Sequence, residues 1–357
     1  MKILLIEISL TGHHLPYLNG VIRGALESNE VRVIVPYTSP ELHISDDCVY
    51  IVPFLAKGLS NYKAWVKAIN KIAENYEPDV IHFLYGDILY RYFGFGIGTL
   101  KKKFRVIITC HQIRRSFLRD YSLRRISEKC SAVVVHTTSL QEDLLQAGIK
   151  NVVHIEYPQF NEIPSIAQKQ ATTILEIPQD NKKVLLAIGG TRYDKGLDIL
   201  LEALCMVKNQ FRLIIAGEEE YFDHFFIEKK VAPYKENVTL ILGFLSEELF
   251  AQCLSACDIV VLPYRKSFDG ASGPLGEGVN LDKMIVGPNH GSLGRIIETN
   301  NLGLTFESED VNDLAQTLDQ ALVEKWQPDE AYLSYQNMLS PRRFQAEYLA
   351  LYLQART

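Results

Sequence analysis

The sequence predicts an α/β protein built around two doubly wound parallel sheets. Short runs of apolar, β-branched residues alternate with amphipathic stretches of about 10 to 20 residues, and this alternation stops once and then starts again. A chain of 357 residues also exceeds one ordinary core, so two domains are expected. Strand, crossover and strand in succession is the pattern of a buried parallel sheet.

The predicted strands form two series. Those of the first series are expected at 2–8, 31–37, 79–85, 105–111, 132–138 and 152–158. Those of the second series are expected at 183–190, 211–217, 237–244, 258–264 and 283–288. Helical periodicity separates the strands, for example at 195–209 and 311–325, and an amphipathic stretch closes the chain at 340–354.

The alternation lapses at Pro158, and the stretch from there to the second series contains three prolines, Pro158 included, and many polar residues. The domains are therefore expected at 1–165 and 183–335, with a linker at 166–182 and a terminal segment at 336–357. In open parallel sheets, ligands bind beyond the carboxyl ends of the strands. We expect the two domains to face one another across a central cleft, with the strand-end loops as candidate ligand contacts.

Composition excludes several protein classes. A net charge of -6 gives no general attraction to nucleic acid. The first residues form a strand pattern without a signal-peptide cleavage site, and no stretch reaches the roughly 18 apolar residues of a membrane span. The six scattered cysteines are typical of reduced thiols, so we expect a cytoplasmic protein. Cys253 and Cys257 lack a second ligand pair at suitable spacing, so no metal site is expected.

The stretch FDGASGPLGEG surrounds two carboxylates, Asp269 and Glu277, with glycines. Ser272 is a favoured N-cap and Pro274 suits a first helical turn, so a helix is expected to begin near Gly273. Asp269 would then lie just ahead of the helix, and Glu277 about one turn inside it. A carboxylate accepts two hydrogen bonds side by side, which fits a vicinal diol such as that of a ribose, and glycines let the backbone approach a bulky ligand.

A second candidate contact follows the strand at 183–190. A glycine turn that contains Gly190 leads into a helix whose first turn is expected to hold Lys195. Backbone N–H groups at a helix start, with Lys195 and Arg192 beside them, form an anion site suited to phosphate. A plain strand-to-helix turn with exposed basic residues is the alternative interpretation.

The second half of the chain resembles the retaining glycosyltransferases of family 4, which have the GT-B fold of two Rossmann-like domains. The family signature is two acids separated by seven residues, and Asp269 and Glu277 have that spacing, with Asp in place of the usual first Glu. The resemblance implies that Glu277 binds the ribose of a nucleotide-sugar donor. It implies that Asp269 and the residues after it contact the donor sugar: Gly270, Ala271, Ser272 and Gly273.

The resemblance extends to other donor-binding positions. Lys195 and Arg192 match the family's diphosphate-binding basic pair, although the arginine usually stands earlier in the turn, where this chain has Gly190. The loops that border the nucleobase in the family correspond to Gly217, Gly243, Phe244 and Leu245.

In the first half, LTGHHLPYLNG resembles the family's glycine loop after the first strand, which implicates Gly12 and His13 in contacts with the donor phosphates and the acceptor. ITCHQI resembles the strand-end histidine, here His111, that reaches the donor sugar from the opposite domain. The family also implies that the terminal helix crosses back to the first domain. Four other histidines are expected to be structural: His14, His82, His136 and His154.

The reaction implied by the resemblance is sugar transfer from a nucleotide-diphosphate donor to a hydroxyl, with retention at the anomeric carbon. The chain contains no Asp-x-Asp, so no metal or other cofactor is expected. Lys195 and Arg192 would neutralise the departing diphosphate, which in the family is commonly described as the base. UDP is favoured over GDP, and the acceptor is expected to be a glycan or lipid-linked glycan in cell-surface polysaccharide or glycoconjugate synthesis.

The stretch 101–125 carries nine Lys or Arg residues and one acid, so it is strongly basic within an acidic chain. In the overlapping stretch 111–129, apolar residues at roughly helical spacing stand among five arginines. One interpretation is a surface that contacts anionic lipid at the inner face of the cytoplasmic membrane. The other interpretation is a solvated face beside the cleft. The apolar residues are Ile113, Phe117, Tyr121 and Ile126.

Three other functions fit parts of the pattern. A nucleotide-sugar epimerase of the same fold would need carboxylates placed for proton transfer at the sugar, and none is evident. A non-catalytic GT-B subunit that scaffolds another transferase would lose the site, whereas Lys195, Asp269 and Glu277 are intact. A dinucleotide oxidoreductase is disfavoured because neither half has G-x-G-x-x-G after its first strand.

Overall fold

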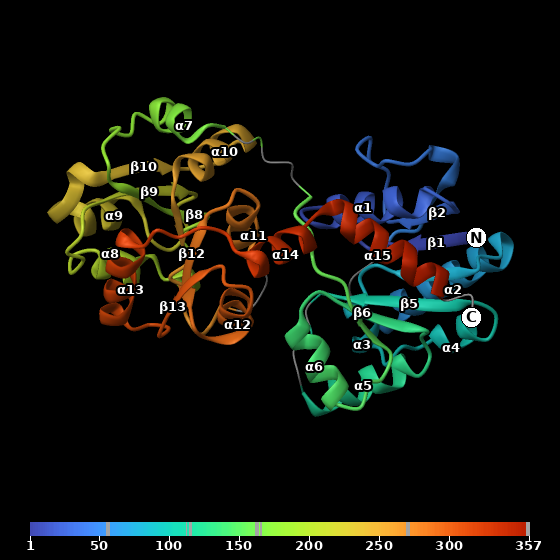
Figure 1. Ribbon diagram of the computed structural model, residues 1–357. Coiled ribbons are helices and arrows are strands. Elements are labelled where there is room, and N and C mark those ends of the chain that lie inside the picture. Colours follow the sequence, from blue (N-terminus) through green and yellow to red (C-terminus); the bar gives the residue numbers. More distant parts are fainter. Residues whose placement is uncertain are drawn as a thin grey trace. The chain divides into compact units, whose positions relative to one another are not determined.

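The computed structural model describes residues 1–54, 58–111, 113, 116–160, 164, 166–268 and 272–354. The chain forms two compact units: unit 1 comprises Met1–Phe160 with Met338–Thr357, and unit 2 comprises Asn161–Asn337. Each unit is built on a parallel sheet flanked by helices, which confirms the predicted fold class (Figure 1).

The described residues of unit 1 contain a seven-stranded parallel sheet in the order β3-β2-β1-β4-β5-β6-β7. Strand β1 lies inside the sheet between β2 and β4, and its Ile3 lies opposite Val31 on one side and Val80 on the other. All six strands predicted here are present. The edge strand β3 is not predicted, because three residues are too few for a recognisable alternation. The strands are β1 (Lys2–Ile6), β2 (Glu30–Val35), β3 (Val49–Ile51), β4 (Val80–Phe83), β5 (Arg105–Cys110), β6 (Ala132–Val135) and β7 (Val152–His154).

Both faces of this sheet are buried, which explains why its strands are apolar at successive positions. Leu4 and Ile6 of β1 pack in the cluster that includes α2, whereas Ile3 and Leu5 pack in the cluster that includes α1 and α15. The helices of unit 1 are α1 (His14–Leu26), η1 (Asp46–Cys48), α2 (Leu59–Tyr76), α3 (Asp87–Arg91), α4 (Ile97–Lys101), α5 (Phe117–Ser127), α6 (Thr138–Gln146) and α15 (Pro341–Gln354).

The C-terminal helix α15 belongs to unit 1, where it lies along α1 (Figure 1). A Cβ atom on Gly24 of α1 would lie only 2.9 Å from the Cα of Gln345, so glycine at this position permits the close approach of the two helices. Phe344, Tyr348 and Tyr352 of α15 are fully buried in the same cluster as α1. The last helix is therefore an integral part of the first core.

A buried hydrogen-bond network joins α15 to the sheet. The Tyr352 hydroxyl bonds His82 Nδ1 at 2.7 Å, and His82 Nε2 bonds the Thr109 hydroxyl at 2.8 Å. The Thr109 hydroxyl lies 3.0 Å from that of Tyr348, which also bonds Tyr17. Burial lowers the pKa of His82 to about 3, so the ring is neutral at physiological pH.

The described residues of unit 2 contain a six-stranded parallel sheet in the order β10-β9-β8-β11-β12-β13. The five predicted strands are present, and the short edge strand β13 is not predicted. The strands are β8 (Lys183–Ile188), β9 (Phe211–Gly217), β10 (Val238–Leu242), β11 (Ile259–Val261), β12 (Met284–Pro288) and β13 (Gly303–Phe306). The helices are α7 (Gln168–Ile174), η2 (Tyr193–Lys195), α8 (Leu197–Ala203), α9 (His224–Val231), η3 (Ala232–Asn237), α10 (Glu247–Ala256), α11 (Gly273–Asn280), α12 (Gly291–Thr299), α13 (Val311–Val323) and α14 (Glu330–Met338).

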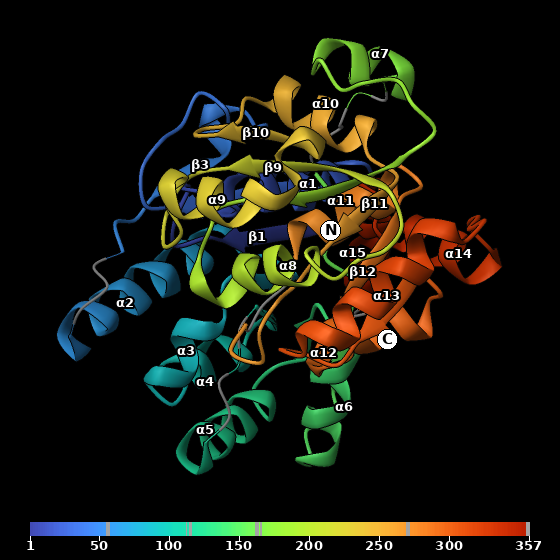
Figure 2. The same cartoon turned by 90° about the vertical axis from the view of Figure 1, so that its left-hand side faces the viewer.

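One face of this second sheet is covered by α8, α9 and α13, which lie together in Figure 2. Their apolar side chains share one core with the strands, including Leu200, Ile227, Leu318 and Val286. This shared core fixes the strands whose carboxyl ends lead into the loops of the candidate site.

The segment for which the sequence predicts a linker contains helix α7. This helix packs on α10. The Gln168 side-chain amide donates to the carbonyl of Ala256 at 3.2 Å and to the carboxylate of Asp258 at 2.9 Å. The sequence analysis missed this helix because its residues are mostly polar and it is only seven residues long.

Candidate functional site

Four loops beyond the carboxyl edge of the six-stranded sheet carry the predicted donor-binding residues of unit 2. Strands β10, β9, β8 and β11 are successive neighbours, so the segments that follow them lie side by side. The Gly243 N–H donates to the Gly217 carbonyl at 2.9 Å, and the Gly189 N–H donates to the Ala216 carbonyl at 2.8 Å. The structure therefore brings together the three glycine positions that follow β8, β9 and β10.

Two of these positions require glycine for different reasons. Gly217 has φ +138°, and a Cβ there would lie 2.3 Å from the carbonyl oxygen of Gly189. Gly243 has φ +116° but has open space around it. Phe244 follows with 83% of its surface exposed, and Leu245 is half-buried. An exposed aromatic ring beside an open backbone turn offers a face on which a planar base can stack.

Lys195 lies in the 3-10 turn η2 and precedes α8, so the prediction that it occupies the first turn of the α-helix is wrong. Gly196 adopts a left-handed conformation with φ +64°, and α8 begins only at Leu197. The Lys195 amine lies over Gly189, where a Cβ would approach Nζ to 2.4 Å. It also lies 6.0 Å from the centroid of the Tyr264 ring.

Both a positively charged group and several acids act on Lys195. Burial lowers the pKa of Lys195, and the neighbouring Arg192 lowers it further. Three acids act in the opposite direction: Glu220, Asp194 and Glu277. Within the part of the chain that the structure describes, the Lys195 amine makes no hydrogen bond or ion pair. A half-buried cation without a direct partner is available for an anionic ligand.

Glu277 lies on α11, which begins as the sequence predicts. The Ser272 hydroxyl accepts the N–H of Leu275 at 3.3 Å, and Pro274 occupies the first turn. Burial raises the pKa of Glu277 to about 7, although Lys195 opposes this rise. The two charged groups that the sequence places 82 residues apart therefore influence one another.

Of the other predicted residues in this stretch, the structure describes Gly273 but not Asp269, Gly270 and Ala271. A Cβ on Gly273 would lie 3.8 Å from Glu277 Oε2, so the backbone there lies near the carboxylate without crowding it. Asp269, Gly270 and Ala271 lie outside the described residues, and their predicted contacts with the donor sugar stay predictions.

Two acids that the sequence analysis did not identify lie beside predicted residues: Asp194 beside Arg192, and Glu220 beside Gly190. The Arg192 Nε and Nη2 groups donate to the Asp194 carboxylate at 2.9 and 2.7 Å, and this pairing raises the pKa of Arg192. A Cβ on Gly190 would lie 1.8 Å from a carboxylate oxygen of Glu220. Asp194 could have been found from its spacing to Arg192, but Glu220 comes from the loop after β9 and needs the fold.

Tyr264 is a further candidate that sequence reasoning missed. Its buried ring faces the Lys195 amine, and its hydroxyl lies 3.4 Å from the Ser272 hydroxyl. Burial raises the pKa of Tyr264 to about 12. Tyr264 could have been identified from the sequence, because it ends the predicted strand at 258–264 and therefore lies at the carboxyl edge of the sheet.

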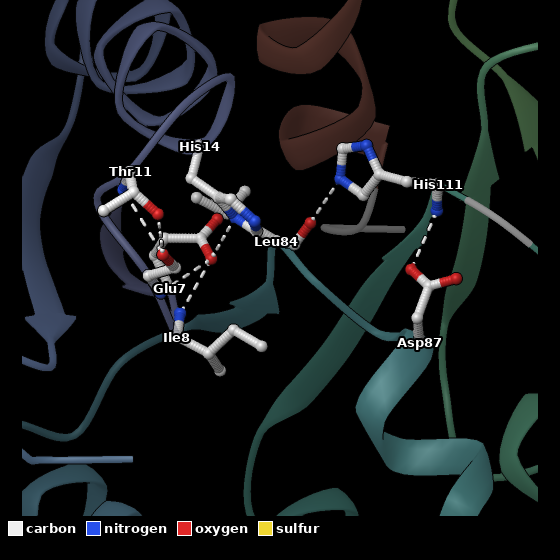
Figure 3. Close-up of polar contacts among 8 residues, drawn as sticks. Glu7, Ile8, Thr11, His14, Leu84, Asp87 and His111 are labelled. Atoms are coloured by element: carbon white, nitrogen blue, oxygen red, sulfur yellow. Dashed lines mark hydrogen bonds and ion pairs between the residues drawn. The ribbon is translucent and has the colours of Figure 1, made fainter. Parts of the chain in front are cut away.

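The predicted residues of unit 1 also lie beyond strand ends. Gly12 has φ +58° and open space around it, and His13 is exposed. The His13 ring stacks on that of His14 with 4.6 Å between centroids. His14, expected to be structural, donates from Nδ1 toward the buried carboxylate of Glu7 at 3.0 Å (Figure 3). The structure thus adds a paired acid and histidine to the predicted glycine loop.

His111 lies at the end of β5, as predicted. Its Nε2 bonds the Leu84 carbonyl at 2.8 Å, and its backbone N–H donates to the Asp87 carboxylate at 2.9 Å (Figure 3). Burial lowers the pKa of His111 well below its ordinary value, and His136 adds to this effect. His111 is therefore a neutral ring whose Nε2 is bonded to Leu84, and among the described residues no hydrogen bond is made by its Nδ1.

Among the described residues, the Nε2 atoms of both His136 and His154 are buried without a hydrogen-bond partner. His136 Nδ1 donates to the Ile155 carbonyl at 2.7 Å. Burial lowers the pKa of His136 to about 4. His154 Nε2 lies 3.3 Å from the Glu156 carboxylate. Among the described residues, no group of His, Cys, Asp and Glu is arranged to hold a metal ion.

The basic stretch contains helix α5, and its apolar residues divide between core and surface. Phe117 and Tyr121 are exposed, together with Leu118, whereas Ile126 is fully buried in the core. The expectation that Ile126 belongs to a surface stripe is therefore wrong, because that side of α5 packs inward. Ile113 packs partly against the same core.

Two family models match the chain. Residues 182–324 match the model described as glycosyl transferases group 1, and residues 21–157 match the model described as glycosyltransferase family 4. Together with the two parallel-sheet units and the loops at their carboxyl edges, these matches define the class. The chain belongs to the glycosyltransferases with the GT-B fold.

Solved structures support the same fold. A glycosyltransferase from Rickettsia africae is 17% identical, with 100% of this chain and 98% of that chain covered and a TM-score of 0.77. HepE from Anabaena, solved with UDP and glucose, is 14% identical, with 99% and 100% covered and a TM-score of 0.71. The lipopolysaccharide outer core galactosyltransferase WaaB is 12% identical, with 100% of both chains covered and a TM-score of 0.70.

A comparison with curated proteins finds no match. No helix in the described ranges combines the length and the apolar character needed to cross a membrane.

Proposed function

We propose that this glycosyltransferase moves a sugar from a nucleotide-diphosphate donor to a hydroxyl acceptor, with retention at the anomeric carbon and without a metal or other cofactor. The proposal rests on two residues, Lys195 and Glu277, each of which influences the pKa of the other. Both are half-buried at the carboxyl edge of the second sheet, and among the described residues neither side chain has a hydrogen bond or ion pair. Charged groups kept in this state cost folding free energy and suit a ligand of complementary chemistry.

Each group has a distinct role in the proposal. The Lys195 amine neutralises the charge that develops on the departing diphosphate, helped by Arg192, and this electrostatic contribution replaces a metal ion. The Glu277 carboxylate accepts two hydrogen bonds from the ribose hydroxyls. The turn at Gly217 and Gly243, with Phe244 and Leu245, borders the base. Asp269 and the four residues after it contact the donor sugar.

The solved relatives support the choice of substrates in this proposal. HepE has been solved with UDP and with UDP-glucose, which supports UDP as the donor nucleotide for this chain and makes UDP-glucose the first probe. WaaB is described as a lipopolysaccharide outer core galactosyltransferase. We infer a glycan or lipid-linked glycan acceptor and a role in cell-surface polysaccharide or glycoconjugate synthesis.

A thermal-shift panel of UDP, GDP, ADP and their sugars tests the donor site. One nucleotide series is expected to raise the melting temperature selectively, because ligand binding to the folded state adds stability by mass action. Glu277→Ala should remove most of that shift while the protein still melts cooperatively. Equal shifts with all nucleotides, or an undiminished shift in Glu277→Ala, would exclude this site. Conversion of a bound donor to an isomer without acceptor would indicate an epimerase.

We also propose that the start of α5 contacts an anionic membrane surface, which would place the enzyme at the inner face of the cytoplasmic membrane. Phe117 and Leu118 expose 87% and 66% of their surfaces, and Tyr121 exposes 51%. The exposed Arg124 and Arg125 stand on the same helix. Adjacent exposed aromatic and aliphatic tips beside cations match the chemistry of an anionic lipid interface.

Co-sedimentation with vesicles tests this contact. The protein is expected to bind vesicles that contain phosphatidylglycerol and not those of phosphatidylcholine alone. The double substitution Phe117→Ser and Leu118→Ser should weaken binding about tenfold or more, because two apolar side chains no longer enter the interface. Phe225→Ser on α9 is the matched control, since Phe225 is 78% exposed. Equal binding by the double variant, or equal loss in the control, would exclude α5 as the contact.

A further inference from the structure

The loop after β9 holds an acid, Glu220, against the turn that follows β8. The hydroxyl of Thr191, a buried residue of that turn, accepts the N–H of Glu220 at 2.9 Å and donates to the Phe222 carbonyl at 2.7 Å. The backbone N–H of Thr191 donates to the Glu218 carbonyl at 2.9 Å. Its carbonyl accepts the N–H groups of Tyr221 and Phe222, both at 3.2 Å. These bonds fix the backbone on both sides of Glu220, so its side chain starts from a defined position.

The Glu220 carboxylate and the Lys195 amine cover adjoining glycines. A Cβ on Gly190 would lie 1.8 Å from Glu220 Oε1. A Cβ on Gly189 would lie 2.4 Å from Lys195 Nζ. Because consecutive Cα atoms are about 3.8 Å apart, the acid and the amine lie over neighbouring positions of one turn. Within the described ranges, the exposed Glu220 carboxylate makes no hydrogen bond or ion pair.

The charged groups near this turn differ in what they offer a ligand. Arg192 is paired with Asp194 by two hydrogen bonds, at 2.9 and 2.7 Å. Burial is the main influence on the pKa of Lys195 and lowers it, whereas Glu220 and Glu277 act in the opposite direction. Glu220 is thus close enough to Lys195 to affect its charge. A diphosphate bound by the Lys195 amine therefore meets a repulsive carboxylate from the adjoining glycine.

Sugar transfer changes the charge of the ligand at this position. In a nucleotide sugar, each phosphate of the diphosphate carries one negative charge. Transfer breaks the bond between the anomeric carbon and the terminal phosphate oxygen, and the electron pair stays on that oxygen. At pH 8 the proton lost by the acceptor hydroxyl ends in solvent, because the second pKa of a terminal phosphate is about 6. The nucleoside diphosphate product therefore carries one more negative charge than the substrate, on its terminal phosphate.

We propose that Glu220 lowers the affinity of the site for the nucleoside diphosphate product more than its affinity for the nucleotide sugar, and so favours product release. This inference rests on the proposed sugar transfer and adds a residue that sets the ratio of the two affinities. Lys195 by itself would bind the product more tightly than the substrate, because attraction to the amine grows with the added charge. Glu220, one glycine away, offsets that gain by repelling the same charge.

Two substitutions change the position or the charge of this carboxylate. Glu220→Gln keeps the shape of the side chain and removes its charge. Gly190→Ala places a methyl group where the carboxylate lies, and the three atoms nearest to that methyl all belong to the Glu220 side chain. Alanine suits the backbone there, because Gly190 does not have a left-handed conformation. This second variant therefore displaces the carboxylate while the charge of the protein is unchanged.

Glu236→Gln is the matched control. Glu236 is exposed and precedes β10, so it lies at the opposite edge of the same sheet. Its recorded contact, with Arg212, is made by its backbone carbonyl. The control therefore removes the same charge from the same unit, far from the turn after β8. Thermal melting should show all three variants folded.

The measurement is the Kd of UDP and of UDP-glucose by calorimetry at pH 8 and pH 5, or of the corresponding pair if the panel selects another nucleotide. At pH 8, Glu220→Gln should lower the Kd of UDP about tenfold and that of UDP-glucose by a factor about three times smaller, because one more charge is relieved of repulsion. The product-inhibition constant of UDP should fall with its Kd. Gly190→Ala should change the ratio of the two Kd values in the same direction, and Glu236→Gln should leave it unaltered.

The measurement at pH 5 isolates the added phosphate charge. There the terminal phosphate of UDP keeps its second proton, so the two ligands carry equal charge. Glu220→Gln should then change both Kd values by the same factor. Both ligands carry the same ribose, so the protonation of Glu277 affects both and cancels in the ratio.

The outcomes distinguish this inference from the proposed function. If UDP-glucose binds and Glu220→Gln leaves the ratio of the two Kd values unchanged at pH 8, the role of Glu220 is excluded and the donor site stands. The role is also excluded if the ratio changes equally at pH 5 and pH 8, or if Glu236→Gln changes it as much. If the unaltered protein binds no nucleotide sugar, the proposed function fails, and the role assigned to Glu220 fails with it.

Discussion

Replacing Lys195 by methionine is expected to lower kcat by about 100- to 1,000-fold, because removal of one preorganised group that stabilises developing charge has an effect of this order. Methionine keeps most of the apolar stem, so packing over Gly189 and beside Tyr264 is largely preserved. The charge that would meet the diphosphate is lost. The measurement is the steady-state rate with the donor that the thermal-shift panel identifies, at saturating concentration.

The effect should fall mainly on kcat, because the charge on the diphosphate increases as the bond to the sugar breaks. Lys229→Met is the matched control, since Lys229 is an exposed lysine on α9 of the same unit. An unchanged kcat in Lys195→Met would remove this lysine from the mechanism. A rise in KM with kcat preserved would reduce its role to uniform binding of the donor.

Replacing Glu277 by glutamine is expected to weaken donor binding and to remove its pH dependence. Because the pKa of Glu277 is raised to about 7, only part of the population carries the carboxylate at pH 6, and most carries it at pH 8. If the ribose diol binds the carboxylate, the Kd of UDP-glucose should rise by up to about tenfold for each pH unit below pH 7 and be constant well above it. A nucleotide sugar is the suitable probe, because its diphosphate does not titrate in this range.

The same substitution should affect stability in the opposite direction. Below the unfolded-state pKa of Glu277, both states hold the proton and the group contributes no pH-dependent difference. Between that value and about pH 7, the folded state retains a proton that the unfolded state has released, so stability falls as pH rises. At pH 8, Glu277→Gln should therefore be more stable than the unaltered protein by about 1–3 kcal/mol, reduced by the remaining solvent exposure.

Urea unfolding at pH 5 and pH 8 measures this effect, with calorimetry of UDP-glucose binding on the same samples. A variant that binds less and folds better would identify Glu277 as a group retained for function at a cost in stability. If Glu277→Gln were less stable at pH 8, or bound the donor as tightly as the unaltered protein, the assignment of the ribose site to this carboxylate would be wrong.

Much of the architecture could be predicted from local pattern. The buried strands were recognisable because a parallel sheet covered on both faces needs apolar, β-branched residues at successive positions, as in 132–135 and 259–261. The start of α11 was also predictable, since Ser272 and Pro274 satisfy local rules of helix capping. The short edge strands β3 and β13 and the polar helix α7 were missed, because their stability comes from neighbours distant in the sequence.

The candidate site likewise contains residues that local pattern predicted and contacts that only the fold creates. Local patterns identified Lys195 and Glu277 as candidates, because glycine turns and helix starts depend on neighbouring residues, whereas Gly217 and Gly243 were named only through the resemblance to family 4. Only the fold brought Glu220 to Gly190. The conformation of the loop after β1, likewise, turns His14 back onto Glu7, seven residues earlier.

From its sequence alone, the protein is an α/β chain with two parallel sheets and a set of polar strand-end residues, because periodicity, capping and glycine usage depend on neighbours within a few positions. The tertiary structure added the burial that raises the pKa of Glu277, the contact between His14 and Glu7 and the place of α15 in the first core. These properties arise from desolvation and from contacts between distant segments, so they exist only once the chain has folded.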